Sequence, residues 1–195
     1  MIKICRWCFV FSLALPESMF AAKQHLAFTV HFYNYARMPA ETVARANWQA
    51  SSVFNAADIA LSWVECPTSE KDAPRFRQCS TEPVFIFMRI LTHSFETGSQ
   101  HNRQHLGVAS DVSVHVFAER VQNFAEEQRL PVHEVMGAVM AHELGHILLG
   151  AGSHSALGIM RPKWRRADFD PASGLLLFTR QQVRSMKASL MSHGF

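Results

Sequence analysis

Two histidines and a glutamate in the second half of the chain have the types and spacing to hold a metal ion and activate a water. His142 and His146 stand four residues apart, and side chains at positions i and i+4 lie on the same face of a helix. Both can direct a ring nitrogen at one point, and neutral imidazole is a good zinc ligand. Glu143 is turned by one residue from His142, so it borders the metal and can take a proton from a metal-bound water.

The residues after this pair supply a third ligand, which a zinc site needs if it is to keep one position open for water. The helix has to end first. Gly150 and Gly152 are suitable stop signals, because glycine accepts the left-handed conformation that closes a helix. His154 follows on a chain that has turned. We therefore predict one catalytic Zn²⁺ ion bound by His142, His146 and His154.

The H-E-x-x-H pattern also occurs by chance, so a helix with two incidental histidines is the alternative. That alternative leaves Glu143 against an apolar surface without a partner, which costs stability without a purpose. The helical context, the glycines at the helix end, the downstream histidine and the Gly158–Met160 tripeptide together favour metal binding.

The segments around this pattern predict the elements that position it. Alternating or continuous apolar runs predict strands at 25–35, 59–64, 84–91, 106–109 and 112–117. Apolar residues at helical spacing predict helices at 39–57, 131–149 and 179–191, and 118–128 is either a short helix or a long loop. The run 84–91 has the apolar content of a central strand buried on both faces. The order predicts an α/β (α+β) fold with a mixed, mostly parallel sheet, an active-site helix and a C-terminal helix.

A polar loop between two of these strands contains three further histidines, His93, His101 and His105. A second metal site is conceivable there. However, the three have no regular ligand spacing, so a solvated surface loop is the preferred interpretation.

Composition limits what the chain does. Its 195 residues are 48% apolar and 18% charged, which suits one globular domain. The net charge of +3 comes from scattered basic residues, so nucleic-acid binding is not expected. No apolar run approaches the roughly 20 residues of a membrane-spanning helix, so stable membrane insertion is not expected either. We expect a monomer.

The first 22 residues have the pattern of a secretory signal peptide. Lys3 and Arg6 give a positive start, 8–15 is a short apolar core, and Ala21 and Ala22 offer a cleavage site. The alternative is a buried N-terminal strand. A cleaved signal predicts a secreted or periplasmic protein whose single domain is 23–195.

The two cysteines that would remain in an exported protein predict one disulfide. Removal of the signal leaves Cys66 and Cys79, and an even count in an oxidising compartment favours a bond between them. Two free thiols are the alternative if the chain stays in a reducing compartment.

Residues Ala141–Met160 resemble the metzincin zinc metallopeptidases, and matrixins most closely among them. Those enzymes show H-E-x-x-H-x-x-G-x-x-H followed by a tight turn that contains methionine. The chain is also similar to small uncharacterised secreted bacterial proteins with H-E-L-G-H. It departs from the family in placing His154 eight residues after His146, where the family has six.

This resemblance implies a metzincin-like zincin fold and a secreted zinc endopeptidase with Glu143 as general base. It implies that Met160 lies beneath the metal as a structural floor. The substrate peptide would lie extended along the edge strand at 106–109.

Two alternatives stay open at this point. Asp168 or Asp170 rivals His154 as third ligand, by analogy with zinc peptidases that use a downstream carboxylate. The second alternative concerns function: the protein could be a zinc-binding secreted module with this fold and no proteolytic activity.

Overall fold

A five-stranded sheet in the order β2-β1-β3-β5-β4 is the framework of the protein in its computed structural model. The structure describes residues 26–69, 71, 79, 86–94, 105–170, 172 and 176–193, so the predicted signal peptide and His101 lie outside the described residues. The strands are β1 Leu26–Asn34, β2 Ile59–Glu65, β3 Ile86–Leu91, β4 Gly107–Ser110 and β5 Ser113–Phe117. The helices are α1 Ala40–Asn55, α2 Ala118–Gln128, α3 Val132–Leu149 and α4 Arg180–His193, with a short 3-10 helix, η4, at Arg166–Phe169.

Four of the strands are parallel, and β4 forms an antiparallel edge. β1 pairs in parallel with β2 and β3, β3 pairs in parallel with β5, and β4 pairs antiparallel with β5. The predicted fold class and the predicted edge strand are therefore confirmed. The segment 118–128, for which a helix and a loop were both considered, is the helix α2.

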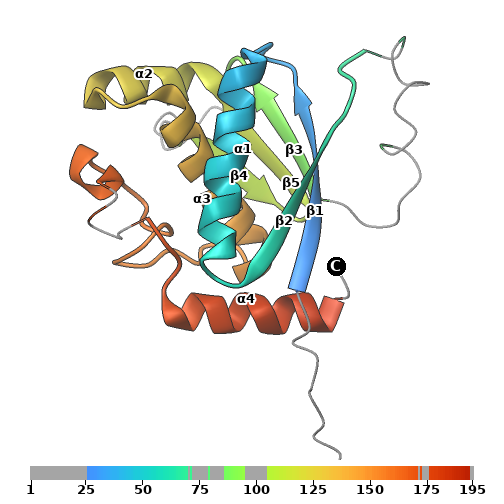
Figure 1. The fold of residues 1–195 in the computed structure, drawn as a ribbon, viewed down its shortest axis with the longest axis vertical. Helices are drawn as coiled ribbons and strands as arrows, with labels where there is room; N and C mark the ends of the chain where they lie inside the picture. Colours follow the sequence, from blue (N-terminus) through green and yellow to red (C-terminus); the bar gives the residue numbers. More distant parts are fainter. Residues whose placement is uncertain are drawn as a thin grey trace, which may run out of the picture.

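One face of the sheet carries the core, and the helices α1 and α3 pack side by side on it (Figure 1). Along β3, buried residues alternate with half-buried ones, so the prediction of a strand buried on both faces is wrong. The physical reason is that α1 and α3 cover the face holding Ile86, Met88 and Ile90, while the side chains between them point to the other face, which is partly exposed. Close helix contact is possible because Gly137 lacks a Cβ, which would lie 2.8 Å from the Ala46 carbonyl oxygen.

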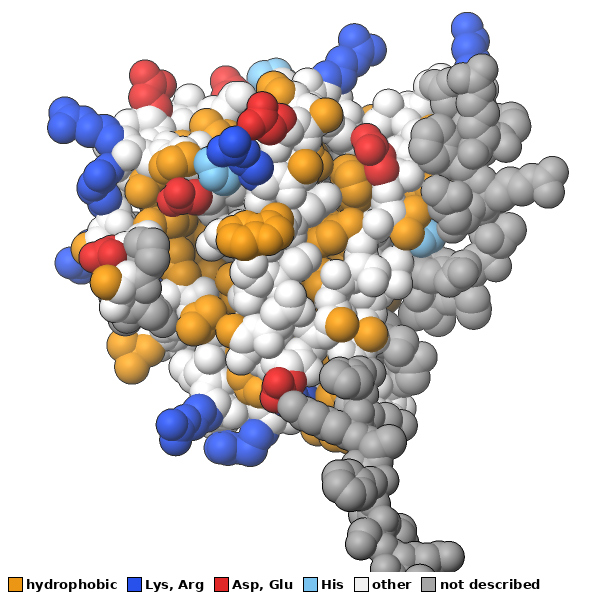
Figure 2. Space-filling model, viewed as in Figure 1, with side chains coloured by type: hydrophobic (Ala, Val, Ile, Leu, Met, Phe, Trp, Pro, Cys, Tyr) orange, Lys and Arg blue, Asp and Glu red, His pale blue; other side chains and the backbone are white. Residues whose placement is uncertain are grey.

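The helix α4 lies across one end of the sheet, near the start of β1, and also contacts α3 (Figure 1). A capping box closes its first turn: the Thr179 backbone N–H donates to Gln182 Oε1 at 2.9 Å, and the Gln182 N–H donates to Thr179 Oγ1 at 3.3 Å. Met186 and Leu190 anchor the helix in the core. On the face of the molecule that α1 covers, charged side chains of both signs are interspersed (Figure 2), in keeping with the small net charge.

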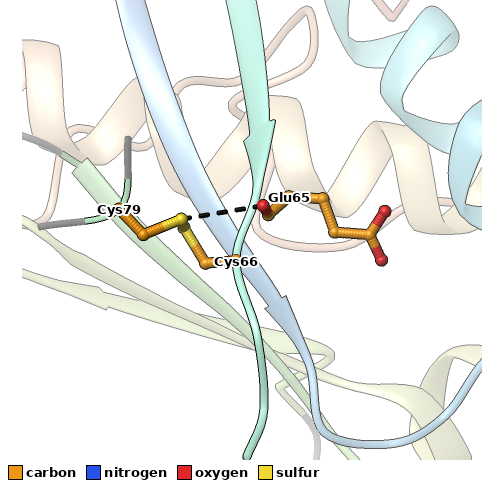
Figure 3. The surroundings of a disulfide bond; sticks show 3 residues. All are labelled: Glu65, Cys66 and Cys79. Carbon is orange, nitrogen blue, oxygen red and sulfur yellow. Dashed lines mark hydrogen bonds between the residues drawn. A yellow bond between two sulfur atoms is a disulfide. The ribbon is translucent and has the colours of Figure 1, made fainter. Parts of the chain in front are cut away.

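A disulfide joins Cys66, which directly follows β2, to Cys79 (Figure 3), as the cysteine count predicted. The Cα atoms are 5.8 Å apart. The bond belongs to the β2 edge of the sheet, whereas β4 forms the other edge. None of the described helices has the length and apolar character to cross a membrane.

Candidate metal centre

The helix α3 supplies the first part of the site because it is buried along most of its length. Twelve of its 18 residues are buried, including His142 and Glu143. The helix ends at Leu149, where the Gly150 N–H donates to the His146 carbonyl at 2.9 Å. Gly150 and Gly152 then adopt φ values of 94° and 73°, which disfavour any residue with a Cβ. The chain turns here, as the glycine pair predicted, and brings His154 back beside the helix.

The three predicted histidines meet at one point through their Nε2 atoms. His146 Nε2 lies 3.1 Å from His142 Nε2 and 3.2 Å from His154 Nε2. Two nitrogens bound tetrahedrally to zinc at 2.0–2.1 Å are about 3.3–3.4 Å apart. The spacing of the side chains therefore fits one zinc ion with little movement.

The outer nitrogens of two of these rings are held by other groups. His142 Nδ1 donates to the Ile159 carbonyl oxygen at 2.8 Å, and His146 Nδ1 is 3.0 Å from Ser153 Oγ. Because a carbonyl oxygen only accepts, the bond at His142 Nδ1 fixes the tautomer that presents a lone pair on Nε2. The serine hydroxyl beside His146 Nδ1 is compatible with the same tautomer. Burial lowers the pKa of His142 to about 4 and also lowers the pKa of His146 and His154. All three rings are neutral at pH 7, as metal binding requires.

Glu143 lies beside this triad in an apolar setting. Its side chain is buried, and burial raises its pKa to about 8 in the protein without metal. A nearby cation favours the ionised carboxylate and opposes this shift. Space for Glu143 depends on Gly107 of β4, because a Cβ there would lie 2.9 Å from Glu143 Cγ.

The chain beyond His154 forms a floor under the helix. Met160 is fully buried, and it packs so closely on α3 that a Cβ on Gly145 would lie only 2.5 Å from its Sδ. Gly158 has a φ of 80° and approaches the Leu177 carbonyl so closely that a Cβ would collide with its oxygen. The turn thus brings Met160 against α3, and its place beneath a metal ion stays a prediction.

The rival third ligands are engaged elsewhere. Asp168 is buried, pairs with the Arg161 guanidinium, and accepts the Arg165 backbone N–H at 2.8 Å. Asp170 Oδ1 accepts the Ala172 N–H at 3.0 Å. Within the described residues, only one other group of three donors lies close together, namely His31, Cys66 and Cys79. Its two sulfurs form the disulfide and are therefore not thiolate ligands.

Two clefts adjoin the triad and share His142 and His154 in their linings. The wider one has a volume of about 640 Å³ and runs past Leu106, Phe124, Val139 and Trp164. The narrower one has a volume of about 180 Å³ and follows Gly107–Ala109 of β4. Because β4 pairs with β5 and with no other described strand, its outer edge can receive a peptide along this cleft.

Four contributors to the site were not predicted: Ser153, Ile159, Trp164 and His105. The Trp164 ring stands edge-on to His142 with 5.4 Å between ring centroids, while His105 lines both clefts. His105 had been placed in a solvated loop. Ser153 and Ile159 lie within the 141–160 stretch that carries the motif, but their contacts with the histidine rings do not follow from its spacing. No local spacing links Trp164 or His105 to the motif.

Comparison with known proteins gives the fold. No family model matches the chain, and no curated protein sequence does either. The archaemetzincin structure from Methanopyrus kandleri aligns with a TM-score of 0.55 at 14% identity, covering 88% of this chain and 99% of that one. A zinc-dependent peptidase from Methanocorpusculum labreanum aligns at 0.56 and 13% identity, over 80% and 99% of the two chains. Metalloproteinase-II from Bacteroides fragilis aligns at 0.53 and 8% identity, over 87% of this chain and 55% of that one.

The protein therefore has the fold of zinc metallopeptidases, built around a centre of three converging histidines. At these identities the likeness concerns the fold alone. The closer resemblance to matrixins, and to the bacterial H-E-L-G-H proteins, stays a prediction.

Proposed function

We propose that the protein is a secreted zinc-dependent metalloendopeptidase. The observation that carries this proposal is the meeting of the three Nε2 atoms beside the buried Glu143, at the junction of two clefts and next to the free edge of β4. A purely structural zinc site has no need of a carboxylate in that place or of access from solvent.

In this proposal His142, His146 and His154 hold one zinc ion. When bound, the ion lowers the pKa of a water towards about 7 and polarises the carbonyl of the scissile bond. Glu143 accepts the proton of the attacking water and later gives it to the leaving amine nitrogen. A bound cation favours the ionised form of the Glu143 carboxyl, which is the form that can accept this proton.

The substrate in this proposal is an extended peptide. Backbone hydrogen bonds to the outer edge of β4 would hold it as an additional strand. The apolar wall formed by Leu106, Phe124 and Val139 would receive one of its side chains. This arrangement places a carbonyl group beside Glu143 without requiring any particular sequence.

Secretion is part of the same proposal. The disulfide between Cys66 and Cys79 is compatible with an oxidising compartment. We propose that residues 1–22 are removed on export and that 23–195 act as one domain.

The test is hydrolysis of casein and of a mixed peptide library by the purified protein, with and without a chelator. We expect cleavage that stops when zinc is withdrawn and returns when zinc is added back. Zinc bound at one ion per chain without any cleavage would contradict the proposal, and would instead identify a zinc-binding module without proteolytic activity.

A further inference from the structure

His105 is the described residue that best fits a catalytic position without being assigned one. Among the residues that line the two clefts, four line both: His142, Glu143, His154 and His105. The first three belong to the proposed zinc centre and its base. His105 therefore lies where the two clefts meet, beside the proposed zinc centre.

The chain that follows His105 lies directly against the proposed metal centre. Two residues further along the chain, Gly107 approaches Glu143 so closely that a Cβ would lie 2.9 Å from Glu143 Cγ. The chain around His105 thus runs directly along the catalytic face of α3.

The backbone at His105 is held in place although its side chain is exposed. The Arg120 guanidinium donates to the His105 carbonyl at 2.7 Å, and the Phe117 N–H donates to the Leu106 carbonyl at 2.9 Å. These hydrogen bonds hold the main chain at His105, while its imidazole is exposed and lines both clefts.

The reaction needs a donor at this place. Attack of water on the peptide carbonyl moves the C=O π electrons onto oxygen, and that oxyanion is stabilised by hydrogen-bond donors aimed at it. The sequence has two tyrosines, Tyr33 and Tyr35. Both belong to β1 or the turn after it, and β1 is two positions from β5 and three from β4 in the strand order. The Arg161 guanidinium, which lines the wider cleft, is paired with Asp168.

We propose that His105 is a further catalytic residue whose ring N–H donates a hydrogen bond to the oxyanion formed during peptide hydrolysis. This role rests on the proposed function. A neutral imidazole has one N–H donor, so no proton needs to be transferred. The water proton goes to Glu143 and then to the amine, and His105 ends each cycle unchanged.

The experiment compares the zinc-loaded wild type with His105→Ala, His105→Gln and the control His93→Ala. His93 is an exposed histidine that bonds Glu119 and lines neither cleft. We expect kcat of His105→Ala to fall about 100- to 1,000-fold, as for removal of one oxyanion donor. KM and zinc content should stay near wild type. His105→Gln keeps an N–H and should recover part of the loss, and His93→Ala should match the wild type.

A second readout does not depend on turnover. A phosphinic peptide carries a tetrahedral, negatively charged oxygen like that of the oxyanion, and its binding is measured by calorimetry. We expect His105→Ala to weaken this binding in step with its loss of kcat/KM, while the affinity for the cleaved peptide products is unchanged.

Three results would overturn the inference in distinguishable ways. A kcat of His105→Ala within threefold of the wild type, with equal phosphinate affinity, removes the role of His105 and leaves the proposed function standing. Loss of zinc in parallel with activity would make His105 a residue that maintains the metal centre. Absence of hydrolysis by the zinc-loaded wild type would remove the proposed function and this role together.

Discussion

His154 departs from the family spacing, yet the structure places its ring beside the other two histidines. The two extra residues before it are absorbed by the turn through Gly150 and Gly152, so its Nε2 still reaches within 3.2 Å of His146 Nε2. The H-E-x-x-H pair could be predicted because its geometry is local to one helix. The preference for His154 over Asp168 rests on side-chain contacts that the sequence pattern does not reveal: Asp168 pairs with Arg161, while His154 Nε2 lies beside His146 Nε2.

Replacement of the two candidates separates their roles. His154→Ala should bind zinc markedly less tightly, because two ligands make a weak site. Asp168→Asn should keep zinc but lower the free energy of unfolding by about 1–3 kcal/mol, because its buried hydrogen bonds are lost. Zinc content by elemental analysis and urea unfolding measure the two effects. Normal zinc in His154→Ala together with loss of zinc in Asp168→Asn would reverse the assignment.

Glu143 should make the stability of the metal-free protein depend on pH. Its pKa is raised from 4.5 to about 8 by burial, so above pH 4.5 the folded protein holds a proton that the unfolded chain releases. The free energy of unfolding therefore falls as the pH rises towards 8. Below pH 6.5 the lowered pKa of His142 acts with the opposite sign.

The clean window for this measurement is thus pH 6.5 to 8. Urea unfolding of the metal-free wild type should show a loss of about 2 kcal/mol across it. Glu143→Gln does not titrate and should show a much smaller change. The same pH dependence in both proteins would show that Glu143 is not held in an apolar pocket.

Three neighbouring elements position the residues of the site. The helix α3 provides two rings and the proposed base Glu143, the turn 150–160 provides the third ring and Met160, and β4 closes the space around Glu143 through Gly107. Element types were predictable because hydrophobic periodicity and capping are local signals. The approach of His105 to this centre could not be predicted, because it depends on the packing of β4 against α3, which are distant in the sequence.

Gln182, in the first turn of α4, links that helix to the turn that carries His154. Gln182 Nε2 donates to Ser155 Oγ at 3.0 Å, directly after His154, and the Gln182 carboxamide also completes the capping box. Gln182→Ala should lower the free energy of unfolding by about 1–2 kcal/mol, through the lost cap and hydrogen bond. It should also speed the release of zinc to a chelator.

The neighbouring Gln181→Ala is the matched control, because Gln181 is exposed on the same turn of α4. It should change neither stability nor zinc release beyond experimental error. If Gln182→Ala and Gln181→Ala release zinc at the same rate, α4 does not support the turn.

At the scale of the whole molecule, the disulfide and the candidate metal centre lie at opposite edges of the sheet. The disulfide follows β2, and the metal centre lies beside β4 at the other end of the strand order. The α/β class could be predicted from the order of elements, whereas the pairing order of strands depends on contacts between distant segments and could not.

Removal of the disulfide should therefore affect stability and not the site. Cys66 and Cys79 are 13 residues apart, and closing a loop of that size stabilises a fold by about 3 kcal/mol. The Cys66→Ser, Cys79→Ser double variant should lose about that much free energy of unfolding and keep its zinc. Unchanged stability would mean that the wild-type cysteines are free thiols in solution.

The most direct test of the proposed peptidase compares the wild type with Glu143→Gln at equal zinc content. The substituted carboxamide would keep the shape of the side chain but accept no proton, so peptide hydrolysis should fall about 100- to 10,000-fold with one zinc still bound per chain. If Glu143→Gln, fully loaded with zinc, cleaves peptides as fast as the wild type, Glu143 is not the base and the proposed mechanism is wrong.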